Sequence, residues 1–483
     1  MDTKKLRQKI LDLAIHGKLV PQDPNDEPAS VLLERIKAEK ERLIKEGKIK
    51  RSKKSAKTSD TPHYPYLLPK GWEWSKLETF INEATDFVAS GSFASLRENV
   101  KYYDEPKYAV LVRTKDFQSN FTKDLVYTDK QGYEFLSNSN LFGGELILPN
   151  IGASIGKVFI VPNLQERMTL APNSIMIRCY KDTHKEWLQY LFLSPFGQEQ
   201  LRIISSSTAQ GKFNKTDLRT LNIPIPPLAE QERIVTEIKR WFTLIDEIEQ
   251  SKFDLQNIIS QTKSKILDLA IHGKLVPQNP NDEPAIELLK RINPDFTPCD
   301  NGHYPQLPFE APQNWSWTTL GKIGKWQSGS TPNRLNKDYY NGNIPWLKTG
   351  DLNNGYITHI PESITEKALN ETSVKLNPTG SVLIAMYGAT IGKIGILTFP
   401  ATTNQACCAC EVFNGIDKEF LFLFLLSHRE EFIKMGGGGA QPNISKEKII
   451  NTYIPLPPFA EQKRIVNTVN VLFTKLDDIM ESL

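Results

Sequence analysis

A segment of thirteen residues occurs twice in this chain without a single difference, at residues 10–22 and again at residues 266–278. A second segment, residues 223–235, returns at residues 454–466 with three differences. In the middle of the chain both segments belong to one stretch, residues 223–278, whereas at the chain ends that stretch is cut, so that its first half closes the sequence and its second half opens it. The sequence is therefore a circle of two repeats, opened inside one helix, and this duplication dictates the architecture.

Length and composition indicate several ordinary globular domains and no membrane attachment. The chain has 483 residues, of which 39% are hydrophobic and 24% are charged, and its net charge is +3. This balance does not by itself indicate a nucleic-acid partner, although it permits a local basic face. Residues 1–7 lack the apolar core of a signal peptide and no apolar run is long enough to span a bilayer, so we expect a cytoplasmic protein.

The cysteines indicate neither disulfides nor a metal site. They are Cys179, Cys299, Cys407, Cys408 and Cys410. They form no paired framework, which fits a reducing compartment. The cluster at 407–410 lacks a second Cys/His pair at zinc-finger spacing, and it aligns with the apolar residues 175–177 of the other repeat. We therefore expect a buried strand at this cluster, and no metal or other cofactor.

Residues 223–278 carry the signals of one long helix. Pro226-Pro227 precedes it, Glu230 and Glu232 lie in its first turn, and His272-Gly273 ends it. A seam at heptad spacing runs between these ends. Its positions are Ile234, Ile238, Trp241, Ile245, Ile248, Lys252, Leu255, Ile259, Thr262, Ile266 and Leu269. Nine of these eleven positions are apolar, which predicts a coiled coil.

The same seam is present in two pieces at the chain ends. Its positions are Ile465, Val469, Leu472, Leu476, Ile479 and Leu483 in the closing segment, and Leu6, Ile10 and Leu13 in the opening segment. A seam of this length has to be buried, so we predict two long helices packed as an antiparallel coiled coil, one continuous and one assembled from both chain ends. The alternative is that each helix belongs only to the core of its own domain.

Two segments between the helical regions share a skeleton of short β-branched and aromatic runs separated by Gly, Pro and Asn. We therefore predict an α/β fold, in which two strand-rich α/β domains in a pseudo-twofold cyclic arrangement are separated by the two long antiparallel coiled-coil helices. The predicted boundaries are 1–62 for the opening helical part and a basic connector, 63–222 for the first domain, 223–302 for the central helical region, 303–453 for the second domain and 454–483 for the closing helix.

A glycine-flanked loop is repeated in the two domains, as Gly152-Ala-Ser-Ile-Gly-Lys157 and Gly388-Ala-Thr-Ile-Gly-Lys393. It has one residue too few between its glycines for a nucleotide phosphate loop, and Val158 or Ile394 takes the position of the hydroxyl that would bind magnesium. Two interpretations stay open. The loop is a plain hairpin turn, or its lysine contacts a DNA phosphate or base edge.

No motif in the sequence predicts catalysis. Pro457-Pro458-Phe459 is similar to the motif of adenine methyltransferases, but Leu456 precedes it where a polar residue would have to accept from the flipped base. His16 and His272 each precede a glycine at a helix end, and helix capping explains both. The sequence contains no His/Glu cluster at metal spacing and no nucleophile elbow. We therefore expect a protein that is not an enzyme.

Three features together resemble the DNA-specificity subunit of type I restriction–modification systems. They are the cyclic order of the repeats, the two helix starts at Pro226–Ile234 and Pro457–Ile465, and the two His-Gly-Lys-Leu-Val-Pro helix ends at His16–Pro21 and His272–Pro277. The resemblance covers essentially the whole chain. It implies a non-catalytic protein whose two target-recognition domains read two half-sites of double-stranded DNA. It also implies two methyltransferase subunits as partners, which restriction subunits join in the nuclease.

Polar positions that match between the two domains are the predicted DNA contacts, because sequence readout needs polar side chains at base edges and Lys or Arg on phosphates adds affinity. In the first domain they are Arg113, Thr114, Lys115, Lys157, Gln210, Lys212 and Asn214. In the second domain they are Lys348, Thr349, Lys393, Gln441 and Asn443. The predicted docking surface for the methyltransferase subunits surrounds Glu230, Arg233, Glu461 and Arg464, although helix capping explains these four residues equally well.

Two rival functions remain open at this point. A self-contained methyltransferase or nuclease would bind S-adenosylmethionine or cut DNA by itself. A coiled-coil adaptor would hold other proteins together without reading DNA.

Overall fold

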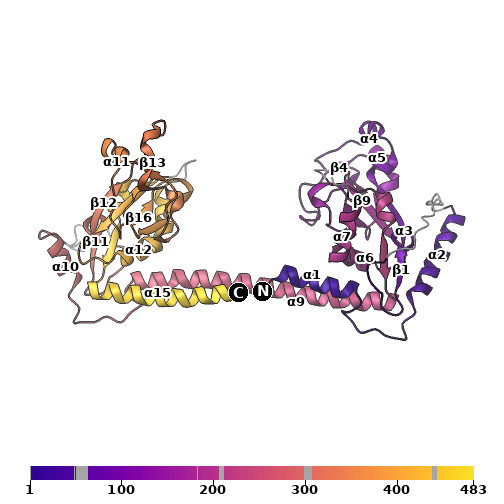
Figure 1. Ribbon diagram of the computed structural model, residues 1–483, viewed down its shortest axis with the longest axis horizontal. Helices are drawn as coiled ribbons and strands as arrows, with labels where there is room; N and C mark the ends of the chain where they lie inside the picture. The colour runs from indigo at the N-terminus through magenta and orange to yellow at the C-terminus, as the bar shows by residue number, and fades with distance from the viewer. Residues whose placement is uncertain are drawn as a thin grey trace. The chain divides into compact units, whose positions relative to one another are not determined.

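The computed structural model describes residues 2–47, 49, 64–181, 183–205, 211–297, 307–437 and 443–483. The chain divides into two compact units, Met1–Ser251 and Lys252–Leu483 (Figure 1). Each unit combines a strand-rich domain with a pair of packed helices. None of the helices in the described ranges is long and apolar enough to cross a membrane.

The first unit contains the antiparallel pair formed by α1 (Thr3–Ile15) and the first half of α9 (Leu228–Ile271), which lie side by side in Figure 1. Arg7, near the start of α1, contacts the carboxylate of Asp246 at 2.5 Å. Gln22, which follows α1, instead reaches Glu230 at the start of α9. Apolar side chains from both helices are buried in this unit, among them Ile10, Leu11, Ile238 and Ile245.

The second unit contains the corresponding pair, formed by the second half of α9 and α15 (Phe459–Ser482). Lys263 forms an ion pair with Asp477 near the end of α15. Gln278, beyond the end of α9, donates to Glu461 at the start of α15 at 2.7 Å. Both helix pairs therefore run in the predicted antiparallel direction, and α9 is continuous over 44 residues as predicted.

The predicted seam is only partly buried. Its well-buried positions are Ile234, Ile238, Ile245, Ile259 and Ile266. Trp241 and Ile248 of α9, in contrast, are 37% and 36% exposed, and Ile479 of α15 is 44% exposed. The expectation of a fully buried seam was therefore wrong at these three positions, because one partner helix covers only part of the circumference of the other.

The strand-rich domain of the first unit contains two sheets. The first is antiparallel and has the order β2 (Ile81–Asp86), β9 (Ser174–Cys179), β6 (Leu146–Pro149), β7 (Phe159–Ile160). The second is mixed and has the order β4 (Tyr127–Thr128), β3 (Ala109–Val112), β8 (Met168–Leu170), β5 (Asn140–Leu141). Alternating residues of β6 and β9, such as Ile147 and Met176, pack between the sheets with Val110. This alternation is the usual consequence of the two-residue period of a strand.

The other face of the first sheet packs against helices and joins the helix pair of the same unit. The helices of this domain are α2 (Ala29–Lys45), α3 (Leu77–Phe80), α4 (Phe93–Asn99), α5 (Lys130–Phe135), α6 (Lys185–Leu193), α7 (Pro195–Ile204) and α8 (Lys215–Arg219). Trp187 and Phe192 of α6 lie in one buried cluster with Ile177 of the sheet and Ile238 of α9. The domain and the helix pair of this unit therefore share one core.

The second unit has the same plan with a wider first sheet. That sheet has the order β12 (Gly324–Ser328), β19 (Cys407–Val412), β16 (Val382–Ala385), β17 (Ile394–Leu397), β14 (Gly355–Ile357). A three-stranded sheet has the order β15 (Ser363–Ile364), β13 (Tyr340–Leu347), β18 (Thr402–Thr403). The helices are α10 (Ala285–Ile292), α11 (Glu366–Glu371), α12 (Lys418–Ser427), α13 (Arg429–Met435) and α14 (Lys446–Ile450). Cys407, Cys408 and Cys410 are buried in β19, which confirms the predicted buried strand.

A pair of adjacent strands connects each strand-rich domain to its long helix. In the first unit these strands are β1 (Glu73–Lys76) and β10 (Asn222–Ile225), and Trp74 pairs with Pro224. In the second unit they are β11 (Ser316–Thr319) and β20 (Tyr453–Leu456), and Trp317 pairs with Pro455. Strands β10 and β20 lead directly into α9 and α15, so the register of the pair sets where each helix begins.

Each predicted helix end is followed by an extended segment, which we call the first strap (residues 16–28) and the second strap (residues 272–284). Nδ1 of His16 lies 2.8 Å from the carbonyl oxygen of Asp12, which agrees with the predicted capping role of this histidine. Gly17 has a φ of +63°, and a Cβ added there would lie 2.4 Å from Cγ of Pro69. Only glycine fits such a position, because the backbone is left-handed and the adjacent space is occupied.

Candidate nucleic-acid interface

In the first unit the repeated glycine loop, Gly152–Lys157, lies against the segment that precedes helix α8. Ile151 forms an isolated antiparallel bridge with Lys212. The amide of Gly152 donates to the carbonyl oxygen of Gly211 at 2.9 Å. The structure therefore brings the glycine loop next to Lys212, although the two segments are far apart in the sequence.

Asn214 has a structural role at the start of α8. Its side-chain oxygen accepts hydrogen bonds from the amides of Thr216 at 2.8 Å and Asp217 at 2.9 Å. Its Nδ2 donates to the carboxylate of Asp217 at 2.7 Å. The side chain therefore caps the helix, and a contact with a base would have to replace these hydrogen bonds.

The loop after β3 holds its arginine within the protein. The amide of Arg113 donates to Oδ2 of Asp116 at 2.8 Å, and Nη2 of Arg113 contacts Oδ1 of the same residue at 2.7 Å. Asp116 is buried. Phe117 stacks on Phe159 of β7 with ring centroids 4.5 Å apart, which fixes the loop beside the strand that follows the glycine loop.

The second unit repeats this arrangement. Tyr387, which precedes the second glycine loop, forms an isolated antiparallel bridge with Asn443. The loop after β13 reaches the far end of the same glycine loop, where Oδ1 of Asn354 accepts from the amide of Ile394 at 3.1 Å. Asn354 has a φ of +57°, a left-handed conformation that Asn tolerates better than most residues. The second glycine loop therefore has the segment of Asn443 at its start and the loop after β13 at its end.

Lys348 matches Arg113 in being neutralised by its own unit. Its amide donates to Oδ2 of Asp351 at 2.8 Å, and its ammonium group pairs with Glu362. That pairing, together with a hydrogen bond from Arg334, holds the pKa of Glu362 below its usual value, although burial acts in the opposite direction. A phosphate contact by Lys348 would therefore compete with a carboxylate that is already ionised.

The predicted contacts differ in accessibility. The exposed ones are Lys115, Lys157, Lys212, Asn214 and Asn443. The half-buried ones are Arg113, Thr114, Lys348, Thr349 and Lys393. Gln210 and Gln441 lie outside the described residues.

Two of the residues predicted to form a docking surface are buried beneath the straps. Glu230 is 1% exposed, and its carboxylate accepts hydrogen bonds from Nε2 of Gln22 at 2.6 Å and Nε1 of Trp72 at 2.9 Å. Glu461 is also 1% exposed and accepts from Gln278. Each carboxylate is therefore covered by its own strap, and the docking role of these two residues stays a prediction.

The two arginines of the predicted docking set form ion pairs with the straps. Arg233 makes a two-pronged contact with Asp26 whose shorter distance is 2.5 Å, and Arg464 makes the matching contact with Asp282 at 2.6 Å. The sequence analysis missed both aspartates. Residues 24–29 and 280–285 are identical, and this identity is the signal that would have found them.

Replacing Glu230 by alanine is expected to lower the free energy of unfolding of the first unit by about 2–3 kcal/mol, because the buried indole N–H of Trp72 loses its acceptor. Hydrogen exchange should show weaker protection of the first strap and the first half of α9. Protection in the second unit should not change, and Glu461→Ala should produce the mirror result. Equal loss of protection in both units would contradict this local role.

Glu230→Gln is the control, because it keeps an acceptor for Trp72. Burial is the main cause of the raised pKa of Glu230, so the folded unit binds this proton more tightly than the unfolded chain does. The stability that this carboxyl contributes is therefore full at low pH and falls as the pH rises through its folded-state pKa. Urea unfolding at several pH values should show the wild type losing stability relative to Glu230→Gln as the pH rises, and the opposite slope would contradict the assignment.

Comparison with known proteins gives a family match over most of the chain. The sequence model described as the type I restriction modification DNA specificity domain matches residues 69–255 and 312–483. The EcoAI type I restriction enzyme specificity subunit of Escherichia coli is 28% identical, with 97% of this chain and 88% of that protein aligned. The EcoEI specificity subunit of Escherichia coli is 27% identical, with 99% and 90% aligned.

Solved structures share the fold. A chain from a study of complex assembly and conformational transition of the type I R-M system matches with a TM-score of 0.58 at 19% identity, covering 86% of this chain and 94% of that one. The HsdS subunit of Thermoanaerobacter tengcongensis matches with a TM-score of 0.53 at 19% identity, covering 86% and 93%. These likenesses agree with the predicted mixed α/β fold, in which strand-rich sheets accompany a long helix.

Proposed function

Because the chain belongs to the family of type I restriction modification DNA specificity proteins, we propose that its two strand-rich domains read two different half-sites of one DNA duplex. A specificity subunit selects the DNA and does not perform the chemistry. The chain is therefore the non-catalytic component that the sequence predicted, and not a self-contained methyltransferase or nuclease.

The observation that carries this proposal is the repeated loop arrangement. In each unit a glycine loop with a terminal lysine lies against a second polar segment, through the Ile151–Lys212 bridge in one unit and the Tyr387–Asn443 bridge in the other. The two glycine loops differ only at Ser154 and Thr390, whereas the segments paired with them carry Lys212 in one copy and Asn443 in the other. Two copies of one scaffold with different polar side chains are suited to read two different sequences.

Within this surface we assign roles by side-chain type. The exposed lysines are proposed to contact phosphates, and the amides and threonines are proposed to contact base edges. The proposed contacts of the first domain are Arg113, Thr114, Lys115, Lys157, Gln210, Lys212 and Asn214. Those of the second domain are Lys348, Thr349, Lys393, Gln441 and Asn443. Arg113 and Lys348 would first have to leave Asp116 and Glu362.

Exchange of residues 63–222 for the equivalent segment of another specificity subunit tests the proposal. We expect one half-site of the methylated motif to change while the other is retained, because each half-site is read within one domain. Methylation-sensitive sequencing of DNA from cells that carry the complete system gives the motif directly. Exchange of residues 303–453 is the matched control and should change the other half-site. A change in both half-sites after either exchange would contradict the proposal.

We further propose that two methyltransferase subunits dock on the helical regions, and that restriction subunits join them. In the first unit α9 exposes an apolar stripe formed by Trp241, Leu244 and Ile248. Exposed apolar groups at this spacing are typical of a helix that receives a partner. Arg233 and Arg464 flank the corresponding helix starts in the two units and remain proposed docking residues.

Trp241→Glu is expected to weaken binding of the methyltransferase subunit to this chain by about tenfold or more, because an interface aromatic residue is replaced by a charge. Analytical ultracentrifugation of the two purified proteins measures this change. Thr243→Glu, at an exposed position two residues along the same helix, is the control for added charge. Equal binding by the Trp241 variant and the wild type would place the docking surface elsewhere.

A further inference from the structure

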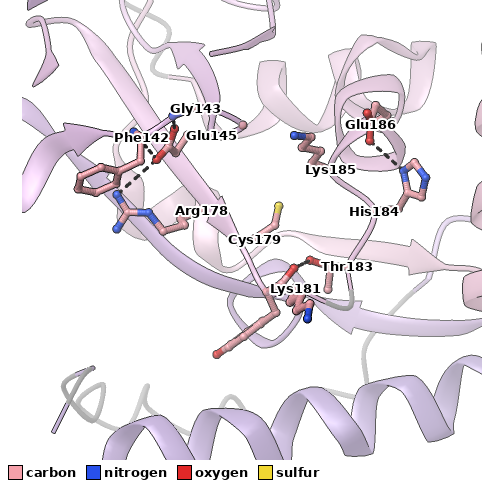
Figure 2. Close-up of a pocket in the computed structure, with 12 residues that line it drawn as sticks. Phe142, Gly143, Glu145, Arg178, Cys179, Lys181, Thr183, His184, Lys185 and Glu186 are labelled. Carbon is pink, nitrogen blue, oxygen red and sulfur yellow. Dashed lines mark hydrogen bonds and ion pairs between the residues drawn. The ribbon is translucent and has the colours of Figure 1, made fainter. Parts of the chain in front are cut away.

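A cavity of about 530 Å³ lies in the first unit, at the end of strand β6 opposite the glycine loop. Figure 2 shows its wall, built from the turn before β6, the end of β9 and the start of α6. The turn contributes Gly143 and Gly144, the strand contributes Arg178, and the segment entering α6 contributes Lys181 and Lys185. The cavity is therefore separate from the proposed DNA contacts, which lie at the other end of the same strand.

The lining of this cavity carries four basic side chains and two carboxylates, those of Glu145 and Glu186. Two of its four basic groups are already paired, since Arg178 contacts Glu83 at 2.9 Å and His184 contacts Glu186 at 3.1 Å. Lys181 and Lys185 form no ion pair with any residue in the described ranges. The ammonium group of Lys185 lies over the turn, because a Cβ added to Gly144 would come within 2.8 Å of it. Two unpaired ammonium groups beside a cavity favour a bound anion.

In the second unit, a carboxylate of the chain itself occupies the position that corresponds to this site. Strand register aligns the two units at this point. Residue 177 of β9 pairs with residue 146 of β6, and residue 410 of β19 pairs with residue 382 of β16. Residues 178 and 411 therefore occupy corresponding positions. The same offset aligns His184 with Asp417. The carboxylate of Asp417 accepts hydrogen bonds from the amides of Glu419 at 2.8 Å and Phe420 at 3.1 Å, and so caps helix α12.

Among the described residues of the first unit, no carboxylate stands in this place. His184 stands at the N-cap of α6, and within the part of the chain that the structure describes no side chain caps this helix. The amides of the first turn have no partner inside a helix. Around them the charge also differs between the copies, because Arg178 and Lys181 correspond to Glu411 and Asn414. The site that a carboxylate fills in one unit is thus open and more basic in the other.

We propose that the cavity of the first unit binds a phosphate group, held by Lys181, Lys185 and the first amides of α6. A phosphate has more charge and more acceptor oxygens than the carboxylate of Asp417, which matches the second lysine of this site. The cavity has room for more than the phosphate itself. Phe142 lines the cavity and is 66% exposed, so its ring offers an apolar surface for the rest of a phosphorylated molecule. The phosphate comes from a free phosphomonoester or from the backbone of flanking DNA.

Isothermal titration calorimetry of the full chain with inorganic phosphate and with AMP tests the proposal. We expect one site for each probe, and affinity for both at least about tenfold lower in Lys181→Ala/Lys185→Ala. Lys418→Ala is the matched control in the second unit and should leave the affinity unchanged. His184→Asp installs the cap that the second unit already has. It should abolish binding of both probes and raise the melting temperature of the chain, because the helix then carries its own anion.

A duplex without the target sequence distinguishes the two sources of the phosphate. If Lys181→Ala/Lys185→Ala and His184→Asp both lose binding of AMP, the phosphate comes from a free phosphomonoester. If only the duplex loses affinity in both variants, with a smaller salt dependence, the phosphate belongs to the DNA backbone. Phosphate, AMP and duplex affinities that are all insensitive to both variants would overturn the proposal. A failure of the half-site assignments would leave this result untouched, because it is measured without a target sequence.

Discussion

Gly17→Val lowers the free energy of unfolding of the first unit by about 3 kcal/mol or more. The left-handed backbone of Gly17, with φ at +63°, is strained for valine by about 1–3 kcal/mol. The added Cβ would also lie 2.4 Å from Cγ of Pro69 and 3.3 Å from the Trp72 ring, so the strap would have to shift at a further cost of about 1–3 kcal/mol. Urea unfolding followed by hydrogen exchange measures the loss and assigns it to a unit.

Two matched variants separate the contributions to this loss. Gly47 also has a left-handed backbone, with φ at +70°, but a Cβ there meets no atom of the described residues within 4 Å. Gly47→Val therefore reports backbone strain without the collision, and its effect should be clearly smaller. Gly273→Val repeats the collision in the second unit, against Pro312. A Gly17 variant no less stable than the Gly47 variant would mean that the strap does not pack on Pro69 in solution.

Lys157→Glu combined with Lys212→Glu is expected to weaken binding of target DNA by about 100-fold at moderate salt concentration. Both lysines are exposed and lie on the two segments that the Ile151–Lys212 bridge joins. Replacing two phosphate contacts by two negative charges also reduces the slope of log affinity against log salt by about 2. Fluorescence anisotropy of the assembled methyltransferase complex, measured over a series of salt concentrations, gives both numbers.

Lys37→Glu with Lys45→Glu is the control for this experiment. Both lysines are exposed on α2, so the net charge of the chain changes by the same amount. The control should retain most of the affinity. If the wild type, the Lys157/Lys212 variant and the Lys37/Lys45 control bind target DNA equally well, the result favours the adaptor function, in which the chain holds its partners without touching DNA. Lys393→Glu then extends the test to the second domain.

Periodicity and repetition predicted the features of this fold that depend on nearby residues. The heptad seam predicted α9, and the His-Gly helix ends predicted the caps at His16 and His272. Both hold because the signals lie within one or two helical turns of the structure that they determine. The buried strand at Cys407–Cys410 was predictable for the same reason, since the matching residues of the other repeat are apolar.

The contacts that the sequence patterns did not predict mostly depend on partners far away in the sequence. Glu230 has the position of an acid that interacts with a helix dipole, but its carboxylate is buried beneath a strap that begins more than 200 residues earlier. No local pattern contains that contact. Arg113 is different, because Asp116 lies only three residues later and indicated an internal ion pair. The unpartnered start of α6 was visible only after strand register had aligned His184 with Asp417.

The hydrogen-bonded strands β1 and β10 make the chain enter and leave the first strand-rich domain at a single point. Strands β11 and β20 do the same for the second domain. Insertions and deletions inside either domain therefore do not disturb the register that fixes the start of the following helix. Such a junction lets a whole strand-rich domain be replaced as a cassette, and it lets the two copies diverge in length and side chains while their anchors stay the same.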